Sequence, residues 1–175
     1  QAGGREEDPA WSPDGQTLAF VSSGGATTQI WVLRLDGGEP VALTDLPGGV
    51  TGPPVWSPDG RRVAFTARVP SAPVVAGAPR VIRRLRYLHN GDGYIGDTFW
   101  HVFWTPIQLP SARPVQLTSG DWHHFSPAWS PDARRLACIS TRRPDWDTEW
   151  VWDVYVLDAD ASIEGPRCLT DSSGT

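Results

Sequence analysis

Short apolar segments recur three times along the chain, and turn-forming polar residues separate them. One set lies at residues 18–20, 63–65 and 136–138, and a second set lies at residues 30–33, 101–104 and 154–157. Runs of this length that are rich in β-branched and aromatic residues and bounded by Gly, Pro and Asp predict β-strands. The chain is therefore expected to be all-β.

Each of the three units offers two further strand candidates. A Trp-containing segment precedes the first apolar run, and a Leu-Thr pair closes the unit at residues 43–44, 117–118 and 169–170. Four short strands per unit is the strand count of one blade of a β-propeller. The pattern predicts about three four-stranded blades.

A repeated motif sets the period of these units. Trp-Ser-Pro-Asp occurs at residues 11–14, 56–59 and 129–132, so successive copies are 45 and 73 residues apart. A period of about 40–45 residues made of short strands is typical of propeller blades. We expect one propeller domain over 1–175, with approximate repeats 8–52, 53–125 (carrying an insertion near 69–99) and 126–175.

The motif has the chemistry of a type I turn. Ser stands at the first position, Pro presets φ at the second, Asp follows, and Gly closes the turn in two of the three copies. Ala133 replaces that Gly in the third copy, where a positive φ would strain it. The tryptophans are predicted to be structural anchors between blades rather than ligand-stacking platforms. The predicted anchors are Trp11, Asp14, Trp56, Asp59, Trp129 and Asp132.

Composition narrows the possible partners. The chain has 175 residues, a net charge of −5, ten Trp and no Met. The acidic balance argues against nucleic acid as a partner, and no apolar run is long enough to predict a membrane span. A chain without Met indicates a trimmed start or an excised piece. No cofactor is expected.

The two cysteines fall on the second and fourth strands of the same predicted blade. Neighbouring strands lie about 4.8 Å apart, so Cys138 and Cys168 are expected to be too far apart for a disulfide. Both are predicted to be free, partly buried thiols, which suits a reducing compartment and a cytoplasmic location.

The second unit is 28 residues longer than the first, and its insertion holds the most basic segment of the chain. Arg83, Arg84, Arg86 and Tyr87 lie there, followed by a turn at residues 90–94. One interpretation is a hairpin extension with a solvated arginine face. The other is a basic rim that contacts a substrate carboxylate or a neighbouring domain, since arginine binds carboxylates in a bidentate fashion.

Two clusters contain side chains that could in principle bind a metal ion. Asp121, His123 and His124 precede the third anchor Trp, but adjacent strand residues face opposite ways, so surface or inter-blade hydrogen bonding is favoured over a metal. The acidic residues between 145 and 153 match no EF-hand spacing and are expected to form a solvated loop. These are Asp145, Asp147, Glu149 and Asp153.

The repeated motif resembles that of TolB-like proteins and of the prolyl oligopeptidase family of serine peptidases. The segments 83–87, 92–94, 101–103 and 141–156 resemble the acylaminoacyl-peptidase branch of that family, whereas residues 120–124 and Ala133 depart from it. The resemblance implies a propeller above an α/β-hydrolase domain that carries a Ser-His-Asp triad. The propeller would admit short peptides to that domain and exclude folded proteins.

The catalytic residues of such an enzyme are not in this chain. No Gly-x-Ser-x-Gly segment occurs in the 175 residues, so the chain alone is expected to hydrolyse nothing. The expected partners are the hydrolase domain of a longer parent chain and short peptides. The alternatives are a TolB-like interaction propeller without activity and, less favoured, a carbohydrate- or ligand-binding propeller. Three blades would leave apolar faces uncovered, so self-association into a six-blade ring is also expected.

Overall fold

The computed structural model describes residues 4–70, 88–89, 93–94, 98–108, 113–143, 146, 148, 151–160 and 165–170. Every regular element in these residues is a β-strand. Among them, no helix is long and apolar enough to span a membrane.

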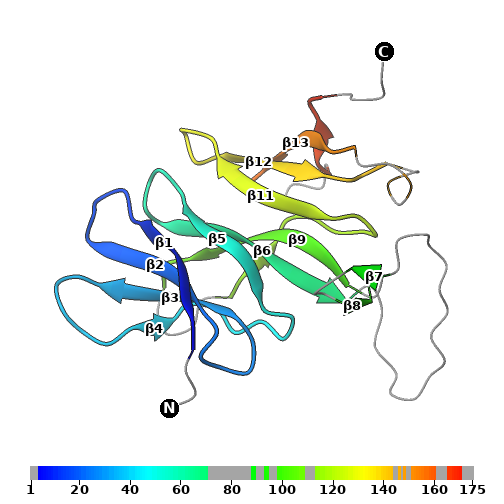
Figure 1. Ribbon diagram of the computed structural model, residues 1–175. Helices are drawn as coiled ribbons and strands as arrows, with labels where there is room; N and C mark the ends of the chain where they lie inside the picture. The colour runs from blue at the N-terminus through cyan, green and yellow to red at the C-terminus, as the bar shows by residue number, and fades with distance from the viewer. Residues whose placement is uncertain are drawn as a thin grey trace.

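Three four-stranded antiparallel sheets make up the fold (Figure 1). In the first sheet, neighbouring strands follow one another along the chain. It contains β1 (Glu6–Trp11), β2 (Thr17–Ser22), β3 (Gln29–Arg34) and β4 (Val41–Ala42). We call this sheet blade 1.

The other two sheets repeat this order. Blade 2 contains β5 (Val50–Trp56), β6 (Arg62–Pro70), β9 (Thr98–Pro106) and β10 (Val115–Gln116). Blade 3 contains β11 (His124–Trp129), β12 (Arg135–Ser140), β13 (Asp153–Asp158) and β14 (Arg167–Cys168). The all-β class and the three four-stranded blades predicted from the sequence are confirmed.

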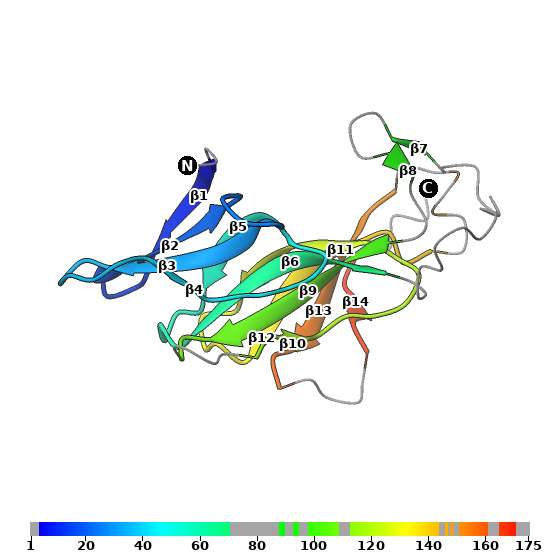
Figure 2. The same cartoon turned by 90° about the horizontal axis from the view of Figure 1, so that it is seen from below.

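A small hairpin lies within the insertion of blade 2. It pairs β7 (Leu88–His89) with β8 (Gly93–Tyr94) in antiparallel fashion. Strands β6 and β9 pair along their whole length, from Arg62 opposite Pro106 to Pro70 opposite Thr98. The hairpin therefore belongs to the segment that joins these two strands, and both views show it near the start of β9 (Figures 1 and 2).

The burial pattern along a strand shows whether its blade is covered on one face or on both. In β13 of blade 3, buried residues alternate with more exposed ones, as expected for a strand covered on one face. In β6 of blade 2, five consecutive residues from Val63 to Ala67 are buried. The middle blade is covered on both faces, and each end blade is covered on one.

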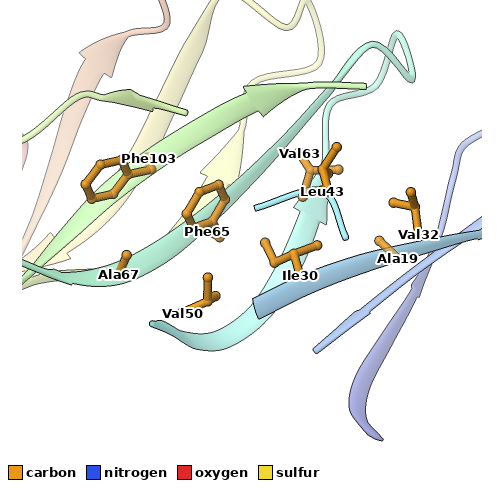
Figure 3. Packing of buried hydrophobic residues seen from close by; sticks show 9 residues of the cluster. All are labelled: Ala19, Ile30, Val32, Leu43, Val50, Val63, Phe65, Ala67 and Phe103. Atoms are coloured by element: carbon orange, nitrogen blue, oxygen red, sulfur yellow. The ribbon is translucent and has the colours of Figure 1, made fainter. Parts of the chain in front are cut away.

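Two apolar clusters hold the blades together. In the first, Ala19, Ile30 and Val32 of blade 1 pack against blade 2 (Figure 3). The blade 2 side of that cluster includes Val63, Phe65 and Phe103. In the second cluster, Ala64 and Val102 of blade 2 pack with Leu136, Cys138, Tyr155 and Leu157 of blade 3. Burial of apolar area between successive blades is the main stabilising contribution in this architecture.

The repeated Ser-Pro-Asp motif forms the same hydrogen-bonded turn in all three blades. In blade 1, Ser12 Oγ donates to Asp14 Oδ1 at 2.6 Å and accepts from the Thr17 N–H at 2.9 Å. The Gly15 N–H donates to the Ser12 carbonyl at 2.9 Å, which closes the turn. The Ser hydroxyl bond holds the pKa of Asp14 below its ordinary value, and the same shift occurs at Asp59 and Asp132.

The turn of blade 3 carries strain that the other two turns avoid. Ala133 has φ of 57°, in the left-handed region where the glycines of the first two turns lie at 69°. A Cβ in this region costs about 1–2 kcal/mol, and glycine loses about 0.4–1 kcal/mol through the greater freedom of its unfolded chain.

Ala133→Gly is therefore expected to raise the free energy of unfolding by about 0.5–1 kcal/mol, because relief of strain exceeds the entropic loss. Urea unfolding of the variant and the unmodified chain checks this. Gly15→Ala is the matched control, since an added Cβ there meets nothing within 4 Å and only the backbone strain remains. It should destabilise by a similar amount, and stabilisation by both changes would contradict the interpretation.

Candidate functional site

Histidines and aromatic residues gather at the end of blade 2 where the insertion leaves it. We define the histidine cluster as His101, His123, His124, Phe99, Trp100 and Trp146. Phe99, Trp100 and His101 lie at the start of β9, and His124 begins β11 of the next blade. Antiparallel pairing places Trp100 opposite Arg68, close to the end of β6. The cluster therefore spans the junction of blades 2 and 3 beside the insertion.

His123 is enclosed by three aromatic rings. Its ring centroid lies 5.2 Å from that of Phe99, 4.9 Å from that of Trp100 and 5.6 Å from that of Trp146. The Trp100 backbone N–H donates to His123 Nδ1 at 3.3 Å, so this nitrogen acts as an acceptor. His123 joins the start of β9 to the segment before β11.

His101 and His124 form a buried pair across the two blades. Their ring centroids are 5.5 Å apart, and the side chains are 3% and 0% exposed. Burial lowers the pKa of His101 to about 4. Burial together with the neighbouring His101 lowers the pKa of His124 to about 3. Both rings are neutral at neutral pH because a charged imidazole would lose its hydration there.

The chemistry available to this pair is limited. A general acid or base needs a pKa near the working pH and access to the substrate, and these two buried rings have neither. No group of three or more His, Cys, Asp or Glu side chains that could hold a metal ion occurs within the described ranges. His123 and His124 contact different partners, as expected for adjacent residues at the start of a strand.

The prediction of a solvated acidic loop is wrong for Asp153. Its side chain is buried at the start of β13, and Arg143 Nη1 lies 3.4 Å from Asp153 Oδ2. Asp153 Oδ1 also accepts from the Thr170 hydroxyl at 3.2 Å. A buried carboxylate needs such partners, so this residue connects Arg143, before β13, to Thr170, just after β14. Asp145, Asp147 and Glu149 lie outside the described residues.

The anchor tryptophans differ in their surroundings. Trp56 Nε1 donates to the Ala10 carbonyl of blade 1, and Trp129 Nε1 donates to the Val55 carbonyl of blade 2, each at 3.0 Å. Trp11 of blade 1 is 58% exposed. Two of the three indoles therefore connect their own blade to the preceding one.

An arginine between two tryptophans strengthens the junction of blades 2 and 3. The guanidinium carbon of Arg62 lies 5.2 Å from the ring centroid of Trp104 and 4.6 Å from that of Trp129. Arg62 Nη2 also donates to the Ala133 carbonyl, and Trp104 Nε1 donates to the Ala159 carbonyl at 2.8 Å. We call Arg62, Trp104 and Trp129 the arginine clamp.

Sequence reasoning did not single out His101, Arg62 or Trp104. Arg62 could have been noticed in the sequence. It stands five residues after the Ser of its turn, and the residue at the corresponding position of blade 1 is the uncharged Thr17. No comparable signal exists for His101, which stands within an apolar strand segment. The predicted contact residues Arg83, Arg84, Arg86 and Tyr87 lie outside the described residues.

Both cysteines are free, as predicted, but they differ in exposure. Cys138 is buried, and burial raises the pKa of its thiol to about 12. Cys168 is exposed rather than partly buried, because it lies on the outermost strand β14. Tyr155 stands between them in the pairing of β12, β13 and β14.

Comparison with known proteins identifies one curated relative. The chain is 30% identical over 162 residues to the uncharacterized peptidase YuxL of Bacillus subtilis (strain 168). This match covers 87% of the chain, which spans only 24% of the length of that relative. No protein-family model matches the sequence.

Solved structures share the fold at low sequence identity. The acylaminoacyl peptidase of Pyrococcus horikoshii superposes with a TM-score of 0.64 at 16% identity, covering 95% of this chain and 25% of that one. A structure described as TolB from Agrobacterium tumefaciens gives a TM-score of 0.58 at 17% identity, covering 95% and 48%. These matches confirm the resemblance recognised in the sequence: the chain has the propeller fold shared with TolB and acylaminoacyl peptidase structures, and its sequence is similar to a segment of a bacterial peptidase.

Proposed function

We propose that this chain is part of the propeller of a serine peptidase of the prolyl oligopeptidase family, and that the propeller limits which peptides reach a hydrolase domain. The observation that carries the proposal is the 30% identity over 162 residues to a bacterial peptidase. The geometry supports it indirectly, because the described residues form a packed scaffold and the buried histidines are unsuited to catalysis. The chain would contribute selection of substrates, and the hydrolase domain would contribute the chemistry.

A rigid wall of blades suits a size filter. Closure of an active site from bulk water protects the reaction, and a narrow entrance favours short, unfolded substrates. The arginine clamp and the buried His101–His124 pair both join blade 2 to blade 3. The histidine pair lies near the end of β6 and β9 that adjoins the insertion, and the clamp lies at the opposite end, so the junction is held at two places along the wall. In this proposal Arg83, Arg84, Arg86 and Tyr87 contact the substrate or the hydrolase domain.

The experiment begins with the coding sequence on both sides of residues 1–175. The proposal expects it to encode a Gly-x-Ser-x-Gly segment followed by Asp and His. The whole protein should then react with a fluorophosphonate probe and cleave a blocked dipeptide anilide, while the 175-residue chain does neither. The same cleavage site placed within a long unfolded polypeptide should be cut much more slowly than the short substrate.

Arg62→Ala in the whole protein tests the filter itself. Loss of the clamp should loosen the junction of blades 2 and 3 and reduce the discrimination against the long substrate, with little change for the short one. Arg61→Ala is the matched control, because the exposed Arg61 stands next to Arg62 outside the clamp. Equal cleavage of short and long substrates by the unmodified protein would refute the filter.

A protein-interaction propeller of the TolB type is the second candidate. It rests on the similarity to the TolB structure. This chain covers 48% of the TolB structure, but only 25% of the Pyrococcus horikoshii peptidase and 24% of the Bacillus subtilis peptidase. A coding sequence without a Gly-x-Ser-x-Gly segment, together with absence of probe labelling, would favour this alternative.

A further inference from the structure

One threonine in each blade holds the end of the last strand to the third strand. These residues are Thr44, Thr118 and Thr170, the threonines of the repeated Leu-Thr pair. Each hydroxyl accepts a hydrogen bond from a backbone N–H of the third strand, at 2.9, 2.9 and 2.8 Å respectively. The N–H groups belong to Ile30, Val102 and Val154. We call this arrangement the threonine latch.

The side chain before that N–H completes the latch as an acceptor of the hydroxyl proton. In blade 1 the threonine donates to Gln29 Oε1 at 2.7 Å. In blade 3 it donates to Asp153 Oδ1 at 3.2 Å. The corresponding residue of blade 2 is His101, whose Nδ1 lies 3.3 Å from Thr118 Oγ1. The three blades therefore use an amide, a carboxylate and an imidazole at one position.

This repetition assigns the proton of the His101 ring. A hydroxyl has one proton to donate, and the latches of blades 1 and 3 give that proton to the side chain of the third strand. The same geometry in blade 2 makes His101 Nδ1 the acceptor, so the neutral ring carries its proton on Nε2. Protonation of the ring would place a second proton on Nδ1 and remove the acceptor of the latch.

The latches differ in how they respond to acid. The amide of Gln29 does not titrate. Asp153 is held by Arg143 at 3.4 Å, and a carboxylate ordinarily protonates at about pH 4. His101 is the one acceptor of the three that ordinarily gains a proton between pH 7 and pH 6.

The surroundings of His101 keep its ring neutral while the latch is closed. Burial lowers the pKa of His101 to about 4, and it outweighs the Gly120 backbone and Asp121, which both favour the charged ring. His124 lies 5.5 Å away between ring centroids, and His123 and Arg142 stand near His124. A ring that opens to water regains its ordinary pKa, so acid favours the open latch.

The latch of blade 2 holds the start of the connection to blade 3. The Leu117 N–H donates to the Val102 carbonyl at 2.9 Å, and the Thr118 bonds follow directly. Further along, His123 Nδ1 accepts the Trp100 N–H at 3.3 Å. We call residues 117–123 the crossing segment, because β11 of blade 3 begins at the next residue.

We propose that blade 2 contains a pH-responsive latch: protonation of His101 frees Thr118 and loosens the crossing segment from β9, while the latches of blades 1 and 3 stay closed. The loosening occurs at the start of β9, where the insertion joins blade 2. The inference concerns the chain itself and does not depend on the proposed function.

The test is hydrogen exchange of the 175-residue chain at pH 7.5 and pH 5, followed by mass spectrometry and corrected for the pH dependence of the chemical exchange rate. Residues 43–49, which follow the latch of blade 1, are the internal reference, because global unfolding exposes both segments equally. Between the two pH values, opening of the crossing segment should increase about 30-fold more than opening of residues 43–49, since the His101 pKa is about 4 when closed and 6.5 when open.

His101→Gln gives blade 2 the latch of blade 1. The amide can accept from Thr118 as Gln29 accepts from Thr44, and it does not titrate. This variant should protect the crossing segment at pH 7.5 and lose the extra opening at pH 5. His124→Leu is the matched control, because it removes the neighbouring buried ring and leaves the latch intact, so the extra opening should remain.

Thr118→Val provides a second variant that does not depend on how glutamine packs. Loss of the hydroxyl should open the crossing segment already at pH 7.5, with no extra opening at pH 5 relative to residues 43–49. An equal increase in both segments of the unmodified chain would overturn the proposal. So would extra opening that persists in His101→Gln or Thr118→Val, or that disappears in His124→Leu.

Discussion

Phe65→Ala is expected to lower the free energy of unfolding by about 3–5 kcal/mol, the range for removal of a large aromatic side chain from a packed core. Phe65 is fully buried between blades 1 and 2 and stacks on Phe103, with ring centroids 5.7 Å apart. Its loss leaves a cavity at the junction that the covered middle blade cannot fill. Urea unfolding followed by tryptophan fluorescence measures the change.

Phe20→Ala is the matched control for this prediction. Phe20 occupies the position in blade 1 that Phe65 occupies in blade 2, but it is only half-buried, because no blade among the described residues covers its face. The expected cost is below about 2 kcal/mol, in proportion to the smaller apolar area removed from water. Both variants are measured at concentrations where the chain is monomeric, and equal losses would contradict the role of blade packing.

Acidification from pH 7.5 to 5 is expected to lower the free energy of unfolding by about 4 kcal/mol, with about 2 kcal/mol from each buried histidine. The folded-state pKa is about 4 for His101 and about 3 for His124, against an ordinary value of 6.5. At pH values between the folded-state pKa and 6.5, each histidine binds a proton in the unfolded chain but not in the folded chain. Stability is therefore complete above pH 6.5 and falls as the pH drops below it.

His124→Leu separates this effect from other titrations. Neither ring nitrogen of His124 has a hydrogen-bond partner among the described residues, so an apolar side chain of similar size removes the titrating group without breaking a bond. The loss between pH 7.5 and 5 should fall to about half, leaving the His101 contribution. Asp14, Asp59 and Asp132 do not interfere, because their lowered pKa values keep them ionised throughout this range. Unfolding midpoints that do not change with pH would refute the prediction.

The arrangement of contacts between blades explains why the middle blade dominates both predictions. Blade 2 contributes Phe65 to the junction with blade 1 and His101 and Arg62 to the junction with blade 3. A substitution in the core of blade 2 can therefore weaken two interfaces between blades, whereas a substitution in an end blade can weaken only one. The same asymmetry leaves Trp11 and Val154 exposed on the end blades.

Local chemistry alone was enough to predict the blades. The strand segments follow from apolar runs bounded by Gly, Pro and Asp, and the Ser-Pro-Asp turn closes through bonds within five residues, as Ser12, Asp14 and Thr17 show. The positive φ at Ala133 could also be anticipated, because glycine holds that position in the other two copies. Interactions of this kind join residues that are close in the sequence, so they can be predicted from the residue types and their spacing.

The sequence pattern did not predict the β-bulges in the first strand of each blade. Strand pairing is interrupted in β1, β5 and β11 just before each anchor tryptophan, where a residue with positive φ precedes a proline. These residues are Asp8, Gly52 and Ser126, with φ of 53°, 75° and 53°. A β-bulge places an extra residue in one strand, and here it falls within a segment that reads as an uninterrupted strand.

The amino-acid sequence by itself thus determined the strands, their turns, the three-blade count and the resemblance to peptidase propellers. Only the tertiary structure decided that Asp153 is buried with Arg143, that Arg62 lies between Trp104 and Trp129, and that His101 and His124 meet as neutral rings. These contacts join residues that lie between 10 positions apart, as for Arg143 and Asp153, and 67 positions apart, as for Arg62 and Trp129. Burial and pKa depend on which faces meet, and that is set by packing between blades rather than by any local pattern.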